Sequence, residues 1–376
     1  GTSEFYTIRA ELTKELITNY GFSFVAVEGD WPSCYELNRY VKGKAPEYLT
    51  AEDALKTFNR WPTWMWANEE VVDLIEWMRD YNTKVRPDTD KQIGFYGIDV
   101  YSLWESMEAI IQYLKQTGSP DVDIAKKAFE CFEPYHRKPE EYAISSAFYG
   151  EDCLQDISSL FHTLTNKKQY ENNDLEGTLN MQVNALVARN AEFYYHTMIT
   201  NDNESWNIRD RHMVEALDYI KDYYGKGTRG IVWEHNTHIG DARATDMADE
   251  DMVNVGQLAR ENYGTDNVYS VGFSTYKGSV IAASKWGEPL QEMKVPEAMV
   301  GSWEDLLHQS GAFNKYLLFS KENHHLFNRT IGHRAIGVLY HPDVEHLGNY
   351  VPSRISDRYD AFIHIEETSA LKPLNI

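Results

Sequence analysis

The sequence is poor in basic residues and has no long apolar run. Lys and Arg number 36 against 58 Asp and Glu among the 376 residues, which gives a formal net charge of −22. Nucleic acids and anionic membranes are bound through an excess of Lys and Arg, so this balance argues against both partners. No apolar run approaches the roughly 18 residues that span a bilayer. Residues 1 to 5 lack the character of a signal peptide.

Cysteines are also scarce: Cys34, Cys131 and Cys153 are the three of the chain. Their odd number and wide spacing predict neither a disulfide framework nor a Cys-based zinc site. We therefore expect a reducing compartment and a cytoplasmic location. A Gly-rich phosphate loop and a G-x-S-x-G nucleophile motif are missing as well, and the sequence has no internal repeat.

The composition is otherwise that of a globular protein long enough for a sizeable core. Hydrophobic residues make up 42% and charged residues 25%, while the aromatic share reaches 13%. We expect some of these rings to line a pocket or an interface. Trp61, Trp64 and Trp66 fall in one predicted loop, where packing under the loop is the simpler interpretation and a pocket wall is the alternative.

Short apolar segments that end in polar residues alternate with amphipathic helices. Residues 22 to 27 form one near-continuous apolar run, residues 93 to 98 form a second, and Gly230–Trp233 form a third. Helical spacing predicts helices before, between and after them, over residues 3 to 20, 32 to 41, 68 to 81, 102 to 114, 208 to 223 and 255 to 263. This alternation predicts an α/β protein with a mostly parallel sheet flanked by helices.

The pattern changes to helices alone between residues 119 and 205. We predict an α/β core domain formed by residues 1 to 118 and 206 to 376, with an all-helical insertion at 119 to 205. The insertion would act either as a lid or as packed bulk. Within the second part of the core, residues 268 to 275 and 279 to 283 predict a β-hairpin that turns at Lys277-Gly278. Further strands are predicted at residues 315 to 319, 331 to 340 and 360 to 365.

Acidic residues and histidines follow the three predicted strands. Glu28 and Asp30 follow the first, Asp99 follows the second, and Glu234, His235 and His238 follow the third. Parallel sheets bind ligands outside the carboxyl ends of their strands, so these side chains predict a cleft there. An isolated H-x-x-H is as readily a capping or surface accident, and other parts of the chain must decide.

Several ordered segments resemble the erythromycin esterase family, which also includes proteins labelled as succinoglycan-biosynthesis proteins. The similar segments are residues 1 to 6 with Arg9, Ala26-Val27-Glu28-Gly29-Asp30-Trp31-Pro32, residues 38 to 41, 95 to 102, Trp233-Glu234-His235-Asn236-Thr237-His238, and residues 254 to 257, 336 to 340 and 360 to 364. The resemblance covers nearly the whole chain. It implies a three-layer α/β/α fold of the EreA/ChaN type and hydrolysis of an ester or lactone. Macrolides are one substrate class, and antibiotic resistance one context, that it suggests.

The resemblance also implies catalytic roles by position. Arg9 matches the family's functional arginine, Glu28 its catalytic carboxylate, and His235 and His238 its later active-site histidines. Substrate-binding or supporting roles are expected for Asp30, Asp99, Tyr101 and Glu234. In the family a G-E-x-x-H-G motif carries the general-base histidine and its last glycine matches Gly1. We therefore expect that histidine directly before the first residue of this sequence.

Ester hydrolysis explains the chemistry of this set. Glu28 would orient an imidazole or hold the attacking water, while the forked donors of Arg9 would bind a substrate carboxylate or the developing oxyanion. The two histidines would donate to the carbonyl oxygen or protonate the leaving alcohol. A structural ion pair is the simpler alternative for Arg9 and Glu28. We expect a small-molecule ester or lactone as partner, no nucleic acid, no membrane and no cofactor.

Three other hypotheses stay open. Glu28, His235 and His238 would suit a divalent metal, which would make the hydrolysis metal-assisted. A glycosidase would pair Glu28 with Asp99 or Glu234, but Arg9 and the histidines would then lack a task. The fold that the resemblance implies also occurs in a haem-binding protein, so a non-catalytic binder of haem or another small ligand is the third.

Overall fold

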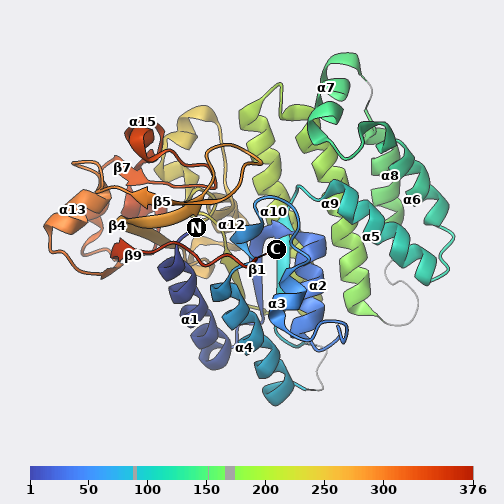
Figure 1. Ribbon diagram of the computed structural model, residues 1–376, viewed down its shortest axis with the longest axis horizontal. Coiled ribbons are helices and arrows are strands. Elements are labelled where there is room, and N and C mark those ends of the chain that lie inside the picture. The colour runs from blue at the N-terminus through green and yellow to red at the C-terminus, as the bar shows by residue number, and fades with distance from the viewer. Residues whose placement is uncertain (88–90, 151, 166–173, 376) are drawn as a thin grey trace. The chain divides into compact units, whose positions relative to one another are not determined.

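A computed structural model describes residues 1 to 87, 91 to 150, 152 to 165 and 174 to 375 (Figure 1). The chain forms two compact units, and each is described by itself. The first unit comprises Gly1–Gly21, Arg39–Ile93 and Val232–Ile376, and the second comprises Phe22–Asn38 and Gly94–Ile231. The core and insertion boundaries near residues 119 and 205 stay a prediction.

The second unit contains the parallel strands that the sequence predicts. Strand β1 (Phe24–Asp30) pairs in parallel with β2 (Gly94–Asp99), and the strand order of this sheet is β2-β1-β3. Strand β3 is Gly230–Trp233, and its last two residues are assigned to the first unit. Nearly every residue of β1 and β2 is buried, because helices rather than water cover a parallel sheet. The α/β class is confirmed.

The pairing of β1 with β2 shifts near the carboxyl ends of the strands. The register runs regularly to Val27 opposite Gly97 and then resumes with Asp30 opposite Asp99. The irregularity brings the backbone of β1 against Gly97, where an added Cβ would lie 2.3 Å from the Gly29 carbonyl oxygen. Only glycine fits at position 97 for that reason. The shift places Glu28 on the irregular stretch of the strand.

Helices are the main other elements of the second unit in the described residues. Their bounds are α2 (Trp31–Val41, which runs on into the first unit), α5 (Leu103–Gln116), α6 (Val122–Glu130), α7 (Pro139–Tyr149), α8 (Leu154–Thr165), α9 (Leu175–Thr197) and α10 (Asp202–Tyr224). Helix α9 packs against α5, α7, α8 and α10, so it is buried around most of its circumference. Its buried polar residues therefore need partners inside the unit.

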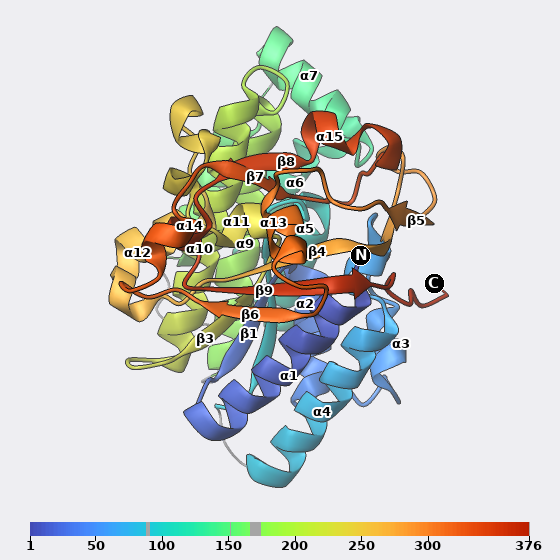
Figure 2. The same ribbon diagram turned by 90° about the vertical axis from the view of Figure 1, so that its left-hand side faces the viewer.

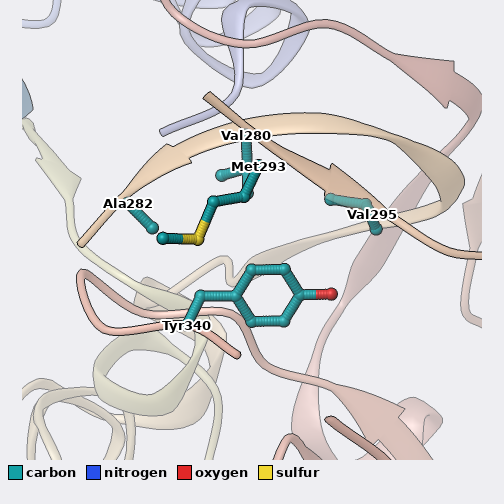
Figure 3. Close-up of a cluster of buried hydrophobic side chains, with 5 residues drawn as sticks. All are labelled: Val280, Ala282, Met293, Val295 and Tyr340. Carbon is teal, nitrogen blue, oxygen red and sulfur yellow. The ribbon is translucent and has the colours of Figure 1, made fainter. Parts of the chain in front are cut away.

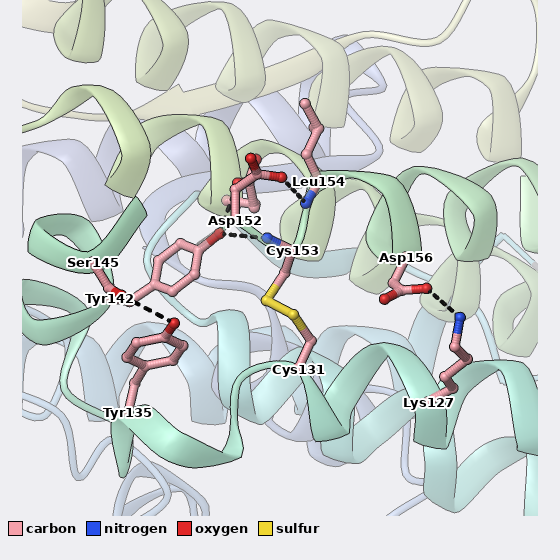
Figure 4. The surroundings of a disulfide bond; sticks show 10 residues. Lys127, Cys131, Tyr135, Tyr142, Ser145, Asp152, Cys153, Leu154 and Asp156 are labelled. Atoms are coloured by element: carbon pink, nitrogen blue, oxygen red, sulfur yellow. Dashed lines mark hydrogen bonds and ion pairs between the residues drawn. A yellow bond between two sulfur atoms is a disulfide. The ribbon is translucent and has the colours of Figure 1, made fainter. Parts of the chain in front are cut away.

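A disulfide joins Cys131 to Cys153 at the facing ends of α6 and α8 (Figure 4). The prediction that the cysteines form no disulfide was wrong, because a separation of 22 residues in sequence becomes 5.9 Å between Cα atoms once the two helices pack. Tyr142 accepts a hydrogen bond from the Cys153 amide and donates one to Glu192. Cys34 is a free, buried thiol. The cysteine argument for a reducing compartment no longer holds, and the cytoplasmic location stays a prediction.

The Cys131→Ser substitution should lower the free energy of unfolding by about 3 kcal/mol, because it opens a loop of this length in the unfolded chain. Urea unfolding of the wild-type protein and the variant measures the difference. A reductant should lower the free energy of unfolding of the wild-type protein to that of the variant. It should leave the free energy of unfolding of the variant unchanged. Equal stability of the two proteins under oxidising conditions would contradict the prediction.

The first unit is built on a four-stranded mixed sheet of order β5-β4-β9-β6 (Figure 2). Its strands are β4 (Val271–Ala282), β5 (Gln291–Val295), β6 (Lys315–Leu318) and β9 (Ala361–Thr368). Strand β9 runs parallel to β4, while β5 and β6 pair antiparallel at the two edges. A second, two-stranded sheet pairs β7 (Ile331–Arg334) with β8 (Tyr350–Ser353). Of the strand predicted at residues 331 to 340, only the first four residues belong to β7.

The predicted hairpin at Lys277-Gly278 was wrong. Strand β4 runs through both residues without turning, and Gly278 pairs with Val295 on one side and Thr368 on the other. Gly278 has a φ of 146°, and an added Cβ would lie 2.0 Å from the Thr368 carbonyl oxygen. Gly278 is required because two strands approach closely there, and not because the chain turns. Alternation in the sequence alone does not distinguish these two uses of glycine.

Helices of the first unit include those that carry or support candidate site residues. Their bounds are α1 (Ser3–Tyr20), α3 (Ala51–Leu55), α4 (Glu69–Val85), α11 (Asn236–Ile239), α12 (Val255–Tyr263), α13 (Trp303–Gln309), α14 (His324–Phe327), α15 (Glu345–Gly348) and α16 (Ile355–Arg358). None of the helices in the described ranges of either unit is long and apolar enough to cross a membrane.

One apolar cluster fixes the segment that follows β7 (Figure 3). Tyr340 packs against β4 and β5 through Val280, Ala282, Met293 and Val295. The amide of Tyr340 also donates to the Ala283 carbonyl at 3.0 Å, so the segment runs alongside the end of β4. Ile336 packs against the same cluster, which positions its carbonyl group for the contact with His235 described below.

Candidate active site

The predicted site residues fall into two groups, one in each unit. Glu28, Asp30, Asp99 and Tyr101 belong to the second unit, and Arg9, Glu234, His235 and His238 belong to the first. Within the second unit, the residues at the ends of β1 and β2 lie together as predicted. Asp30 ends β1 and lies opposite Asp99, the last residue of β2.

Arg209, which the sequence analysis did not single out, joins the two strand ends. It lies on α10 and donates from Nε and Nη2 to the two carboxylate oxygens of Asp99, at 2.9 and 2.8 Å. Nη2 also donates to Glu28 Oε1 at 2.8 Å. The side chains of Arg209, Glu28 and Asp99 are 12%, 13% and 6% exposed. The forked pair with Asp99 is the strong, directional form of an Arg–carboxylate interaction.

The charges in this group stabilise one another. Burial disfavours the guanidinium charge, but the attraction of the Asp99 and Glu28 carboxylates outweighs it, so the pKa of Arg209 lies above its usual value. Tyr101 places its ring 4.9 Å from the guanidinium carbon of Arg209. Burial raises the pKa of Tyr101, which keeps its hydroxyl protonated.

Helix α9 reaches this group through two consecutive tyrosines. The Tyr194 hydroxyl lies 3.3 Å from the Tyr101 hydroxyl, and the Tyr195 hydroxyl donates to the Tyr101 carbonyl oxygen at 2.7 Å. Tyr101 is thus held at both its backbone and its ring. The segment predicted as a helical insertion therefore fixes the loop that follows β2.

His212 supports Asp99 from one turn further along α10. Its Nδ1 faces the amide nitrogen of Asn190 at 3.1 Å and must accept, so Nε2 carries the proton and donates to the Asp99 carbonyl oxygen at 3.3 Å. Burial lowers the pKa of His212 to about 4. His212 is therefore a neutral, buried donor that fixes the backbone at Asp99.

This pKa predicts a loss of stability on acidification. Below about pH 6.5 the unfolded chain protonates His212, whereas the folded protein resists protonation until about pH 4. The contribution of His212 is therefore complete above pH 6.5 and falls by roughly 3 kcal/mol as the pH drops to 4. The His212→Gln variant should lack this part of the pH dependence in urea unfolding, while replacement of the exposed His196 should keep it. A constant difference between wild type and His212→Gln across this range would contradict the prediction.

In the first unit, two aromatic rings hold Arg9. Its guanidinium carbon lies 4.3 Å from the Tyr6 ring centroid and 4.7 Å from that of Trp233, the last residue of β3. Each ring is fixed in turn, because Tyr6 donates to the Met65 carbonyl oxygen and Trp233 Nε1 donates to Thr13 Oγ1. Cation–π contacts of this kind set the orientation of a guanidinium and leave its edge for other partners.

His235 uses both ring nitrogens within the first unit. It is the N-cap of α11, where Nδ1 accepts from the Thr237 amide and lies 2.8 Å from the Thr237 hydroxyl. Nε2 lies 3.0 Å from the Ile336 carbonyl oxygen and must donate to it. His235 is therefore a fixed, neutral imidazole. Donation to a substrate would require it to release the Ile336 carbonyl.

Hydrogen bonds from Asn236 hold the segment that contains His235 against strand β4. Its side chain exchanges hydrogen bonds with the Phe273 amide and carbonyl groups, and Nδ2 lies 3.2 Å from His333 Nε2. His333 is fully buried and donates from Nδ1 to Glu304 at 2.6 Å. Burial lowers the pKa of His333, so it is neutral. Glu234 and His238, on either side of His235 and Asn236, are buried as well.

Some of the donor atoms proposed for a metal already have protein partners. Glu28 Oε1 binds Arg209, and both nitrogens of His235 have partners in their own unit. In neither unit do the described residues include a group of three or more His, Cys, Asp or Glu placed to hold a metal ion. The metal hypothesis for Glu28, His235 and His238 stays a prediction.

These features define an α/β protein in which acidic residues lie at the ends of two strands and histidines follow a third. The family model for erythromycin esterase matches residues 17 to 368, so the chain belongs to the erythromycin esterase family. A curated relative, erythromycin esterase type II from Escherichia coli, is 20% identical over 351 residues, which cover 84% of this chain and 77% of that protein. Family membership supports a hydrolase-type function.

Three solved structures share the fold. A Bacillus cereus protein aligns with a TM-score of 0.80 at 19% identity, over 100% of this chain and 88% of its own. A succinoglycan biosynthesis protein aligns with a TM-score of 0.76 at 20% identity, over 99% and 86%. A mutant of the erythromycin esterase EreC in its open conformation aligns with a TM-score of 0.68 at 14% identity, over 98% and 88%.

Proposed function

We propose that the protein hydrolyses an ester or lactone of a small molecule by attack of an activated water. The observation that carries the proposal is the pairing of Glu28 with Asp99 and Arg209 at the ends of adjacent parallel strands. A carboxylate held in a fixed position orients a general-base imidazole or the water itself. The family to which the chain belongs supplies the class of reaction.

Arg9 and the histidines take the remaining roles in this proposal. Arg9, which the rings of Tyr6 and Trp233 orient, binds a substrate carboxylate or the oxyanion that develops in the transition state. His235 and His238 act as donors to the carbonyl oxygen or to the leaving alcohol. Asp30, Asp99, Tyr101 and Glu234 hold these groups or contact the substrate. Cytoplasmic location remains part of the proposal.

The glycosidase hypothesis finds less support in the geometry. A glycosidase needs one protonated carboxylic acid and one carboxylate on opposite sides of a sugar bond. Glu28 and Asp99 instead accept from the same Nη2 atom of Arg209, which stabilises the ionised form of both. No contact in the described residues points specifically to haem.

Turnover of a panel of p-nitrophenyl esters and lactones tests the proposal. The full chain is used, together with any residues that precede Gly1. Hydrolysis above the background rate that Glu28→Gln abolishes would support it. No turnover of any ester or lactone, together with a new absorbance band on addition of haem, would favour the binding protein instead.

The Arg9→Lys variant should remain at least tenfold less active than the wild-type enzyme. Lysine restores the charge, but a point charge cannot reproduce the forked donors or the stacking between two rings. Measurement of kcat and KM on the best ester of the panel tests this, with Lys14→Arg, at a partly exposed site on the same helix, as control. Full activity of Arg9→Lys would leave only a requirement for charge.

A further inference from the structure

We infer that Arg209 is a positioning residue that keeps Glu28 and Asp99 ionised and side by side in the active site. The inference rests on the proposed function, in which Glu28 acts as a carboxylate. Arg209 comes from α10 and lies 181 residues from Glu28 and 110 residues from Asp99 along the chain. It would act through these two side chains and not on the substrate.

The geometry requires an arginine rather than any cation. Nε and Nη2 engage the two oxygens of Asp99, and Nη2 makes a second bond to Glu28. The two carboxylate oxygens that share Nη2 therefore lie within two hydrogen-bond lengths of each other. A lysine nitrogen on a flexible stem would reach one carboxylate well and would leave the direction of the other undefined.

The charge of Arg209 matters because the two carboxylates are close and poorly exposed. Two neighbouring carboxylates without a cation tend to share one proton, since the second ionisation must overcome repulsion from the first. A protonated Glu28 would lack the negative charge that orients an imidazole or takes up a proton from water. The guanidinium removes this repulsion at neutral pH.

Other titratable groups that face this pair do not replace the cation. In the described residues these groups include Asp30 on β1, Cys34 on α2, Tyr101 after β2, Tyr194 on α9 and His212 on α10. Asp30 adds negative charge, and the buried His212 is neutral at physiological pH. Arg209 directly bonds both carboxylates.

The simpler alternative is an ion pair that stabilises the fold and has no effect on catalysis. Variants Arg209→Gln and Arg209→Lys separate the two, with the exposed Arg211→Gln on the same helix as control. We expect Arg209→Gln to lower kcat at pH 7 at least tenfold. The acid limb of its pH–rate profile should move up by about one pH unit or more, because an opposite charge at this distance shifts a carboxylate by that amount. Part of the lost rate should return at higher pH.

Arg209→Lys should keep the acid limb near its wild-type position but remain slow, because the charge returns without the fork. A lower melting temperature with wild-type kcat and an unmoved acid limb in both variants would overturn the inference. Arg209→Lys also serves as the test if Arg209→Gln does not fold.

A second measurement keeps this test separate from the proposed function. Carboxyl carbon NMR of the wild-type protein and the Arg209 variants reports the titration of Glu28 and Asp99 without any substrate. We expect at least one of the two to titrate about one pH unit higher in Arg209→Gln. If the wild-type protein hydrolyses no ester, the proposed function fails, and an unchanged titration would overturn the inference about Arg209 independently.

Discussion

Replacement of Glu28 by Gln should lower turnover by about 10²-fold or more and leave the fold nearly intact. Glutamine has the same shape and can still accept one hydrogen bond from Arg209. It lacks the charge that orients and polarises a general-base imidazole or an attacking water. The loss should appear mainly in kcat, because the charge acts on the reacting groups in the transition state rather than on substrate binding.

Steady-state kinetics and thermal unfolding of the same preparations measure the two effects. Glu130→Gln, at an exposed site on α6, is the matched control for the loss of one carboxylate from the second unit. A variant at position 28 that melts at a lower temperature but turns over substrate at the wild-type rate would show that the ion pair with Arg209 is structural only.

Most elements were predictable from the sequence because their local signals agree with their packing. Strand β3 and helix α12 begin and end where the sequence predicts, since each has an apolar pattern with a clear stop, Gly264 in the case of α12. The prediction failed at Gly278 because one residue type serves both turns and close approaches. It failed at Cys131 and Cys153 because their pairing depends on how α6 and α8 pack.

Part of the candidate site was also predictable from the sequence. Parallel strands end at one edge of a sheet, so the proximity of Glu28, Asp30 and Asp99 follows from their positions after apolar runs. Arg209 was not predictable, because it sits within an amphipathic helix among other charged residues. Which of these faces the strand ends depends on the rotation of α10 against β2. No local pattern in the sequence indicates how α10 is rotated.

The different surroundings of His235 and His238 were also not predictable from the sequence. The sequence places two histidines after β3 and suggests equal roles for them. In the structure His235 caps α11 and donates to a carbonyl that a segment about 100 residues later provides, while His238 is buried on the helix itself. Two residues of one motif therefore have different surroundings, and their variants need different controls.

Replacement of either His235 or His238 by Ala should lower turnover by roughly 10²- to 10³-fold if each donates to an oxyanion or a leaving group. His235→Ala should also lower the free energy of unfolding by about 1 kcal/mol, because it removes the cap of α11. His235→Asn separates these effects, since asparagine is a good N-cap but cannot replace the Nε2 donor. Activity should stay low in His235→Asn while stability returns.

Chelators decide between the donor role and the metal hypothesis. If the histidines are donors, dialysis of the full chain against a chelator should leave turnover unchanged, and the exposed His325→Ala control should behave like the wild-type enzyme. If they bind a metal, activity should fall on dialysis and return with one added divalent ion, and either His→Ala change should remove stoichiometric metal. We favour the donor role, because Nε2 of His235 already carries the proton that it would donate and neither unit gathers three or more His, Cys, Asp or Glu around a metal position in the described residues. Tight, stoichiometric metal in the purified wild-type protein would overturn that preference.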